Sequence, residues 1–109
     1  MKEIAIEEWK DVKGYEGYYQ ASSLGRIKSI SRKRYNKNGG KPGVLKERIL
    51  KQTKNGDGYY CVKFYKNGKS KFIKVHRLIA DTFINNLKND PEVNHKDGVK
   101  TNNKTSNLE

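Results

Sequence analysis

The alternation of apolar and polar residues predicts a β-hairpin in the second half of the chain. Residues 59–65 combine aromatic and β-branched side chains, and residues 71–75 follow them after an Asn67-Gly68 turn. Side chains of a strand alternate between its two faces. The residues expected to share the apolar face of the first strand are Tyr60, Val62 and Phe64.

Shorter strands are expected before this hairpin. Residues 18–21 and 26–30 have an extended-type pattern on either side of a turn at residues 22–25. Residues 48–51 form another strand candidate. The stretch between them, residues 36–43, is polar and rich in glycine, which predicts a loop.

A single main helix is expected after the hairpin. Residues 79, 80, 83 and 84 are apolar, and this spacing places them on one helical face. Residues 93–95 form a short strand candidate, and residues 97–109 are polar and Asn-rich. The pattern therefore predicts an α+β fold, with a small antiparallel sheet built from residues 18–30 and 46–75, a helix near 76–85 and an irregular C-terminal tail.

Composition narrows the class of protein. The chain has 109 residues, of which 33% are hydrophobic and 33% are charged, so one small domain with a thin core is expected. No apolar run approaches the roughly 18 residues that a membrane span needs, so we expect no membrane partner. The single cysteine, Cys61, excludes an intramolecular disulfide and a multi-cysteine zinc site, which indicates a reducing, cytoplasmic compartment.

The charge is strongly positive and unevenly distributed. The net charge is +12, and residues 26–54 carry 11 basic and 1 acidic side chains, a net of +10. Such a concentration is typical of a surface that contacts nucleic-acid phosphates, although a solvated basic segment without a partner is the alternative. The nucleic-acid-binding candidates are Arg26, Lys28, Arg32, Lys33, Arg34, Lys37, Lys41, Lys46, Arg48, Lys51 and Lys54.

The two histidines have different surroundings. His76 lies among apolar residues where the hairpin meets the helix, which indicates a structural histidine with a backbone partner. His95 lies beside Asn94 and Asp97 before a glycine turn. A histidine next to oxygen ligands can act as general base in a metal-assisted nuclease, while a plain surface turn is the alternative.

Two longer motifs resemble those of phage-type HNH homing endonucleases. Residues 8–29, EWKDVKGYEGYYQASSLGRIKS, are similar to the nuclease-associated modular domain of that family. The second motif is similar to that of the HNH nucleases, and it consists of VHRLIA at 75–80, Phe83, VNHKDG at 93–98, NN at 102–103 and SNLE at 106–109. On this resemblance we expect a modular domain at 1–30, a basic linker and strand at 31–54, and an HNH-like region at 55–109, packed as one compact unit.

The resemblance also implies roles for individual residues. It makes His95 the general base, Asn94 the first metal ligand and Asn107 the residue that braces the metal loop. It implies magnesium or another divalent cation, for which the neutral amide of Asn94 is a weak ligand. In the family a helix with a second metal ligand follows the N-L-E motif, whereas this sequence ends at Glu109, so we expect an incomplete ββα-metal element.

Three functions are compatible with the sequence. The first is a nucleic-acid-binding protein, catalytically weak or inactive, whose partner is duplex DNA. The second is an active metal-dependent endonuclease or nickase completed by a partner or a longer chain. The third is a small phage-type inhibitor of a nucleoprotein nuclease such as a CRISPR effector, whose partner is RNA or a protein–RNA complex.

Overall fold

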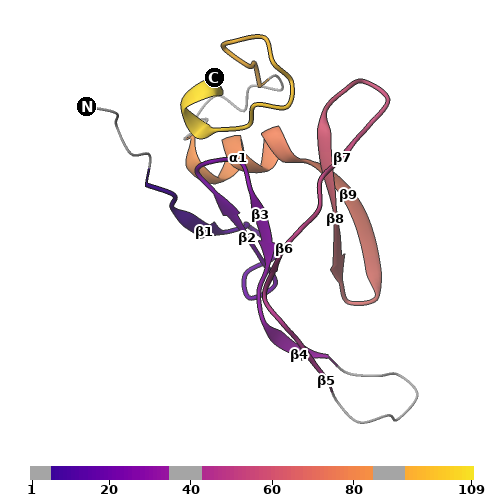
Figure 1. Cartoon of the computed structure of the whole chain (residues 1–109). Helices are drawn as coiled ribbons and strands as arrows, with labels where there is room; N and C mark the ends of the chain where they lie inside the picture. The colour runs from indigo at the N-terminus through magenta and orange to yellow at the C-terminus, as the bar shows by residue number, and fades with distance from the viewer. Residues whose placement is uncertain (1–5, 35–42, 85–92) are drawn as a thin grey trace.

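The computed structural model describes residues 6–34, 43–84 and 93–109, and the strands and helices below belong to these ranges. Strands in three antiparallel sheets and one α-helix make an α+β fold, as predicted (Figure 1). The four-stranded sheet has the order β1 (Trp9–Asp11), β2 (Tyr19–Ser22), β3 (Ile27–Ser29), β6 (Arg48–Ile49). The other elements are β4 (Arg32–Arg34) paired with β5 (Gly43–Leu45), the sheet of β7 (Thr53–Lys54), β8 (Tyr60–Lys66) and β9 (Lys69–Lys74), helix α1 (Val75–Phe83) and the 3-10 turn η1 (Thr105–Asn107).

The predicted hairpin is present as β8 and β9, with Phe64 opposite Lys71. Asn67 and Gly68 connect the two strands, and both have positive φ, +53° and +75°. Two positive φ values in a two-residue turn match the twist of the flanking strands, which explains why the Asn-Gly pair marks this hairpin in the sequence. Helix α1 starts directly after β9, and its described course agrees with the predicted helix.

The core lies where the four-stranded sheet, the β8–β9 hairpin and α1 meet. Phe64 is fully buried and stacks on Tyr19 with ring centroids 4.0 Å apart. Ile27 from β3 and Ile79 from α1 belong to the same cluster, as does Leu108 near the C-terminus. Residues of the expected segments 1–30 and 55–109 therefore share one hydrophobic core, and Leu50 of the basic middle segment packs against it.

A tyrosine hydroxyl joins two of the sheets. Tyr19 lies in β2, and its hydroxyl oxygen accepts a 2.9 Å hydrogen bond from the backbone N–H of Tyr65 in β8. A strand edge that lacks a partner strand leaves backbone groups to satisfy, and here a side chain satisfies one of them. This contact fixes β8 relative to the four-stranded sheet.

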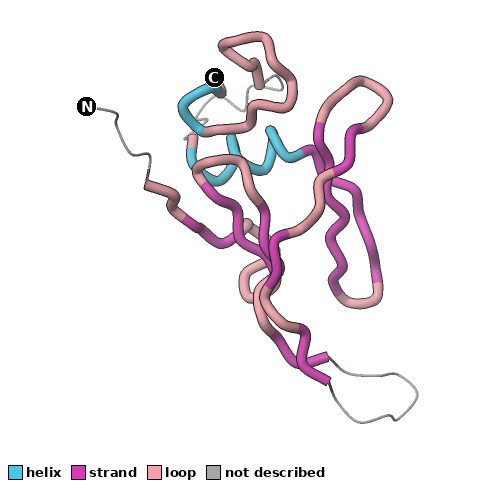
Figure 2. Tube along the Cα trace, viewed as in Figure 1, coloured by secondary structure: helices cyan, strands magenta, loops and turns pink. Residues whose placement is uncertain are grey.

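The strands are divided differently from the expectation of one sheet. Residues 18–30 and 46–75 fall into the four-stranded and three-stranded sheets, which Figure 2 shows as separate groups of strands. Strands β1, β4, β5 and β7 were not predicted, because each has only two or three residues and its described side chains are mostly polar or exposed. Most of the predicted loop at 36–43 lies outside the described residues.

Across the described residues, no helix is long and apolar enough to cross a membrane.

Candidate active site and nucleic-acid interface

His95 lies on a short hairpin near the C-terminus. It forms a β-bridge with Leu108, whose buried side chain anchors this hairpin in the core. Asn94 and Glu109 exchange two backbone hydrogen bonds of 3.0 Å, and the Lys96 N–H donates to the Asn107 carbonyl at 2.8 Å. The backbone at His95 is therefore held on both sides by the paired strand segment.

Asp97 and two asparagines hold the loop that closes this hairpin. The Asn107 amide donates to an Asp97 carboxylate oxygen at 3.0 Å and to the Asn102 carbonyl at 2.9 Å. The Asn102 amide donates to the other Asp97 oxygen at 2.7 Å. These hydrogen bonds, the one from Asn102 above all, lower the pKa of the Asp97 carboxyl. The Asp97 carboxylate is thus occupied within the loop.

The imidazole of His95 is oriented by the buried amide of Asn103. Its Nε2 atom lies 2.8 Å from Oδ1 of Asn103, which is only 4% exposed. In this orientation the Asn103 amide oxygen can only accept a hydrogen bond, so the contact requires the proton on Nε2, and in the uncharged form of the ring Nδ1 then keeps a free lone pair. A ring in this state can take a proton from water through Nδ1.

Sequence reasoning did not select Asn103 as a site residue. The only available signal was its place in the Asn102-Asn103 pair of the resembling motif. Its contact with His95 is made across the loop, eight residues away, and no periodicity in the sequence encodes it.

His76 is buried beside His95 and is held uncharged. The two ring centroids are 5.3 Å apart, and Tyr59 packs 4.8 Å from the His76 ring. Burial, with a smaller effect of His95, lowers the pKa of His76 to about 4. Its Nδ1 atom is buried and has no hydrogen-bond partner among the described residues, so the expected backbone partner is not present at this atom.

The described residues supply an incomplete set of metal ligands. Asn94 is exposed and could offer one neutral oxygen, whereas the carboxylate of Asp97 is already hydrogen-bonded within its loop. Nowhere in residues 6–34, 43–84 and 93–109 do three His, Cys, Asp or Glu side chains gather as a metal site would require. Divalent magnesium prefers charged oxygen ligands, so these residues by themselves do not fit the ion.

The predicted nucleic-acid-binding residues have different environments. Arg26 is paired with Glu7, and the ammonium group of Lys28 lies 3.4 Å from Glu47. The Arg32 guanidinium points inward, where it donates to the backbone carbonyls of Tyr18 and Ile30 and to the hydroxyl of Ser29. Arg26 is exposed although it is paired, and the exposed cations of this set that form no ion pair with a described residue are Lys46, Arg48, Lys51 and Lys54.

Four other predicted residues have no described side chain. Lys33 and Arg34 lie in β4, where the structure describes only the backbone, and Lys37 and Lys41 lie outside the described residues.

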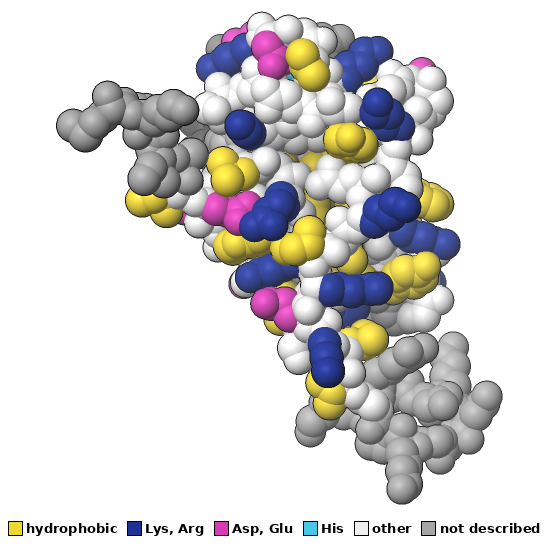
Figure 3. All heavy atoms as spheres, in the orientation of Figure 1, with side chains coloured by type: hydrophobic (Ala, Val, Ile, Leu, Met, Phe, Trp, Pro, Cys, Tyr) yellow, Lys and Arg dark blue, Asp and Glu magenta, His cyan; other side chains and the backbone are white. Residues whose placement is uncertain are grey.

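A basic groove runs between β6 and β8. Its volume is about 360 Å³, and its polar lining includes Lys46, Arg48 and Lys63 beside Tyr65. Lys63 also lies over the rings of Tyr65 and Phe72, at 5.3 and 5.4 Å from the centroids. Lys and Arg side chains extend along the whole face shown in Figure 3, where acidic side chains are few. Lys63 was not among the predicted binding residues, since it lies outside the basic segment.

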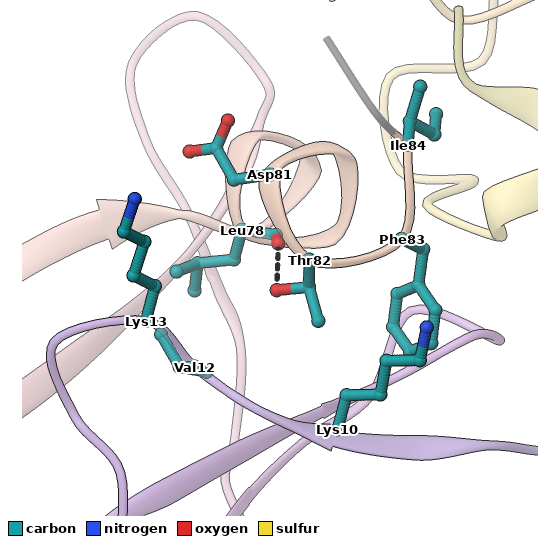
Figure 4. A pocket seen from close by; sticks show the side chains of 8 residues that line it. All are labelled: Lys10, Val12, Lys13, Leu78, Asp81, Thr82, Phe83 and Ile84. Carbon is teal, nitrogen blue, oxygen red and sulfur yellow. Dashed lines mark hydrogen bonds between the residues drawn. The ribbon is translucent and has the colours of Figure 1, made fainter.

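A larger hollow of about 750 Å³ lies between β1 and α1 (Figure 4). Lys10 and Lys13 from the β1 region face Asp81 and Phe83 of the helix across it. Its lining contains none of the predicted site residues, so the candidate chemistry lies elsewhere.

The chain resembles known nucleases over almost all of its length. The NUMOD4 motif matches residues 7–65, so it ends inside β8, before the turn of the hairpin. DNA endonuclease I-HmuI of Bacillus phage SP01 is 44% identical over 101 residues, which are 93% of this chain and 50% of that protein. An uncharacterised HNH endonuclease of Acanthamoeba polyphaga mimivirus is 39% identical over 104 residues, 95% of this chain and 27% of the relative.

The fold agrees with this likeness. A solved structure of the HNH homing endonuclease I-HmuI, described as showing DNA binding and cleavage, superposes with a TM-score of 0.72 and 42% identity. The match covers 93% of this chain and 50% of that chain. This chain therefore spans about half the length of I-HmuI and about a quarter of the mimivirus relative.

Proposed function

Because the chain belongs to the family of phage-type HNH homing endonucleases that carry the NUMOD4 motif, we propose that it binds duplex DNA and provides the general-base part of an HNH cleavage centre. The observation that carries the proposal is the fixed His95 ring, whose Nδ1 is left free by the hydrogen bond from Nε2 to Asn103. Its place of action would be the cytosol of a phage-infected or bacterial cell.

DNA binding is supported by the charge of the described surface. Within residues 6–34, 43–84 and 93–109, only Arg26 and Lys28 form ion pairs, so most exposed lysines and arginines keep their charge available. The groove between β6 and β8 places Lys46, Arg48 and Lys63 on one surface. Contacts of this kind bind phosphates without reading sequence, and they dominate the affinity of most DNA-binding proteins.

The role of His95 is to move a proton. Its Nδ1 takes a proton from the attacking water while the bond from Nε2 to Asn103 keeps the ring in place. A divalent cation, if one were held here, would supply stabilisation of the charge on the phosphate. The described residues offer one candidate metal ligand, Asn94. We therefore propose that efficient cleavage needs further metal ligands from another segment or another chain.

Binding is tested by fluorescence anisotropy with labelled duplex DNA and unlabelled competitors. We expect duplex DNA to bind, and RNA of the same length to compete more weakly. If the chain does not bind free DNA and binds only a guide-RNA–protein complex, inhibition of a nucleoprotein nuclease would replace the function proposed here.

Cleavage is tested separately, by nicking of supercoiled plasmid in magnesium or manganese. We expect no detectable nicking by the 109-residue chain, as for His95→Ala, because general-base catalysis alone contributes about 10²–10⁴-fold, which is far less than phosphodiester hydrolysis requires. Nicking by the wild-type chain that disappears in His95→Ala would show that these residues already form a working nuclease.

A further inference from the structure

The turn between β2 and β3 lies directly against the loop that carries Asn103. The backbone N–H of Thr105 donates a 2.8 Å hydrogen bond to the Ser23 carbonyl. A Cβ atom at Gly25 would lie 2.8 Å from the Asn103 carbonyl oxygen and 2.9 Å from its carbonyl carbon. The two backbones therefore meet at a distance that only glycine permits.

This turn has a closely defined conformation. The buried Ser22 hydroxyl accepts hydrogen bonds from the N–H groups of Leu24 and Arg26, at 3.2 and 3.0 Å. Gln52 donates to the Gly25 carbonyl at 2.8 Å, and Gly25 itself has a φ of +89°. Each of these contacts restricts the turn, so it presents a fixed surface to the residues packed on it.

We propose that the β2–β3 turn is a positioning element of the HNH centre: it seats Asn103, which orients the imidazole of His95. In this role the turn and Asn103 act through the His95 ring and not on the substrate. The chain of contacts runs from the Gly25 backbone to the Asn103 backbone, and from the Asn103 amide oxygen to Nε2 of His95. This inference rests on the proposed role of His95 as general base.

The state of the His95 ring can be observed directly by NMR, without activity. In the ¹⁵N-labelled 109-residue chain at about pH 8.5, where histidine rings are neutral, we expect a proton on Nε2 that exchanges slowly with water. Asn103→Ala removes the acceptor, so this exchange should become about five- to tenfold faster, as expected for the loss of one hydrogen bond. Asn103→Asp keeps an acceptor oxygen and should restore slow exchange.

The contribution of the turn is tested with two glycine variants. Gly25→Ala places its methyl group against the Asn103 backbone, whereas Gly17→Ala meets nothing within 4 Å although its φ, +81°, is equally unsuited to alanine. Both variants carry the backbone strain, but only Gly25→Ala should shift the ring resonances of His95 and accelerate its Nε2–H exchange.

Three results would overturn the inference: a proton found on Nδ1 of His95, unchanged exchange in Asn103→Ala, or equal effects of the two glycine variants. A dispersed amide spectrum of each variant shows that it is folded. Since the readout needs neither DNA nor metal, loss of DNA binding would contradict the proposed function and leave this result standing.

Discussion

At the scale of the single residue, His76 links the stability of the fold to pH. Burial lowers its pKa from the ordinary 6.5 to about 4, so the unfolded chain binds a proton at a higher pH than the folded one. Stability should therefore fall as the pH drops from about 6.5 to about 4, by up to about 3 kcal/mol. The pKa of Asp97 is also lowered, so protonation of its carboxylate causes a separate loss of stability that starts only at more acidic pH.

Urea unfolding between pH 7 and pH 4.5 measures this dependence. His76→Phe keeps a ring of similar size that does not titrate, so its free energy of unfolding should vary much less over this range. If the wild type and His76→Phe showed the same pH dependence, the buried histidine would not be its source.

Individual site residues differ in how far the sequence could predict them. His95 and Asn107 come from the resemblance to the HNH motif, and they lie on the two facing segments of the C-terminal hairpin, where His95 pairs with Leu108. Their catalytic roles stay predictions. Asn103 and Lys63 could not be found in this way, because the first acts through a contact across the loop and the second joins the groove only because strands of two different sheets lie side by side.

At the scale of the element, the β8–β9 hairpin depends on which face a side chain occupies. Phe64 is fully buried and stacks on Tyr19, whereas Phe72 on the paired strand is 67% exposed. Phe64→Ala should therefore lower the free energy of unfolding by about 3–5 kcal/mol, enough to unfold much of the protein. Phe72→Ala makes the same chemical change at an exposed position and should cost less than about 1 kcal/mol. Thermal unfolding followed by circular dichroism compares the two variants, and similar losses of stability would mean that the assignment of faces is wrong.

The hairpin and the helix could be predicted because several local signals agree there. Apolar alternation, the Asn67-Gly68 turn and the apolar face of residues 79–84 each come from nearby residues. The division into three sheets could not be predicted, since it depends on which strand edges meet. Contacts such as the hydroxyl of Tyr19 on Tyr65, 46 residues apart, decide that arrangement.

At the scale of the whole molecule, a charge of +12 should make DNA binding strongly dependent on salt. If about 5–8 phosphates are contacted, log K should fall with log salt with a slope of roughly −4.5 to −7. Replacing Lys46 and Arg48 by alanine removes two groove charges and should reduce the magnitude of that slope by about 2. Anisotropy titrations at several salt concentrations measure it, with Lys10→Ala/Lys13→Ala, beside the hollow at α1, as the matched control. A slope near zero for the wild type would contradict phosphate-driven binding.

The boundary of the NUMOD4 motif has a consequence for how such proteins can evolve by exchanging parts. The motif ends at residue 65, but β8 continues to Lys66 and pairs with β9 beyond the turn. A gene fusion made at this boundary would keep Phe64 with Tyr15 and Tyr19, but it would pair β8 with a foreign strand in place of β9. Recombinant proteins that fold should therefore take β8, β9 and α1 from the same parent. The segment that is exchanged between such genes would then extend beyond the end of the NUMOD4 motif.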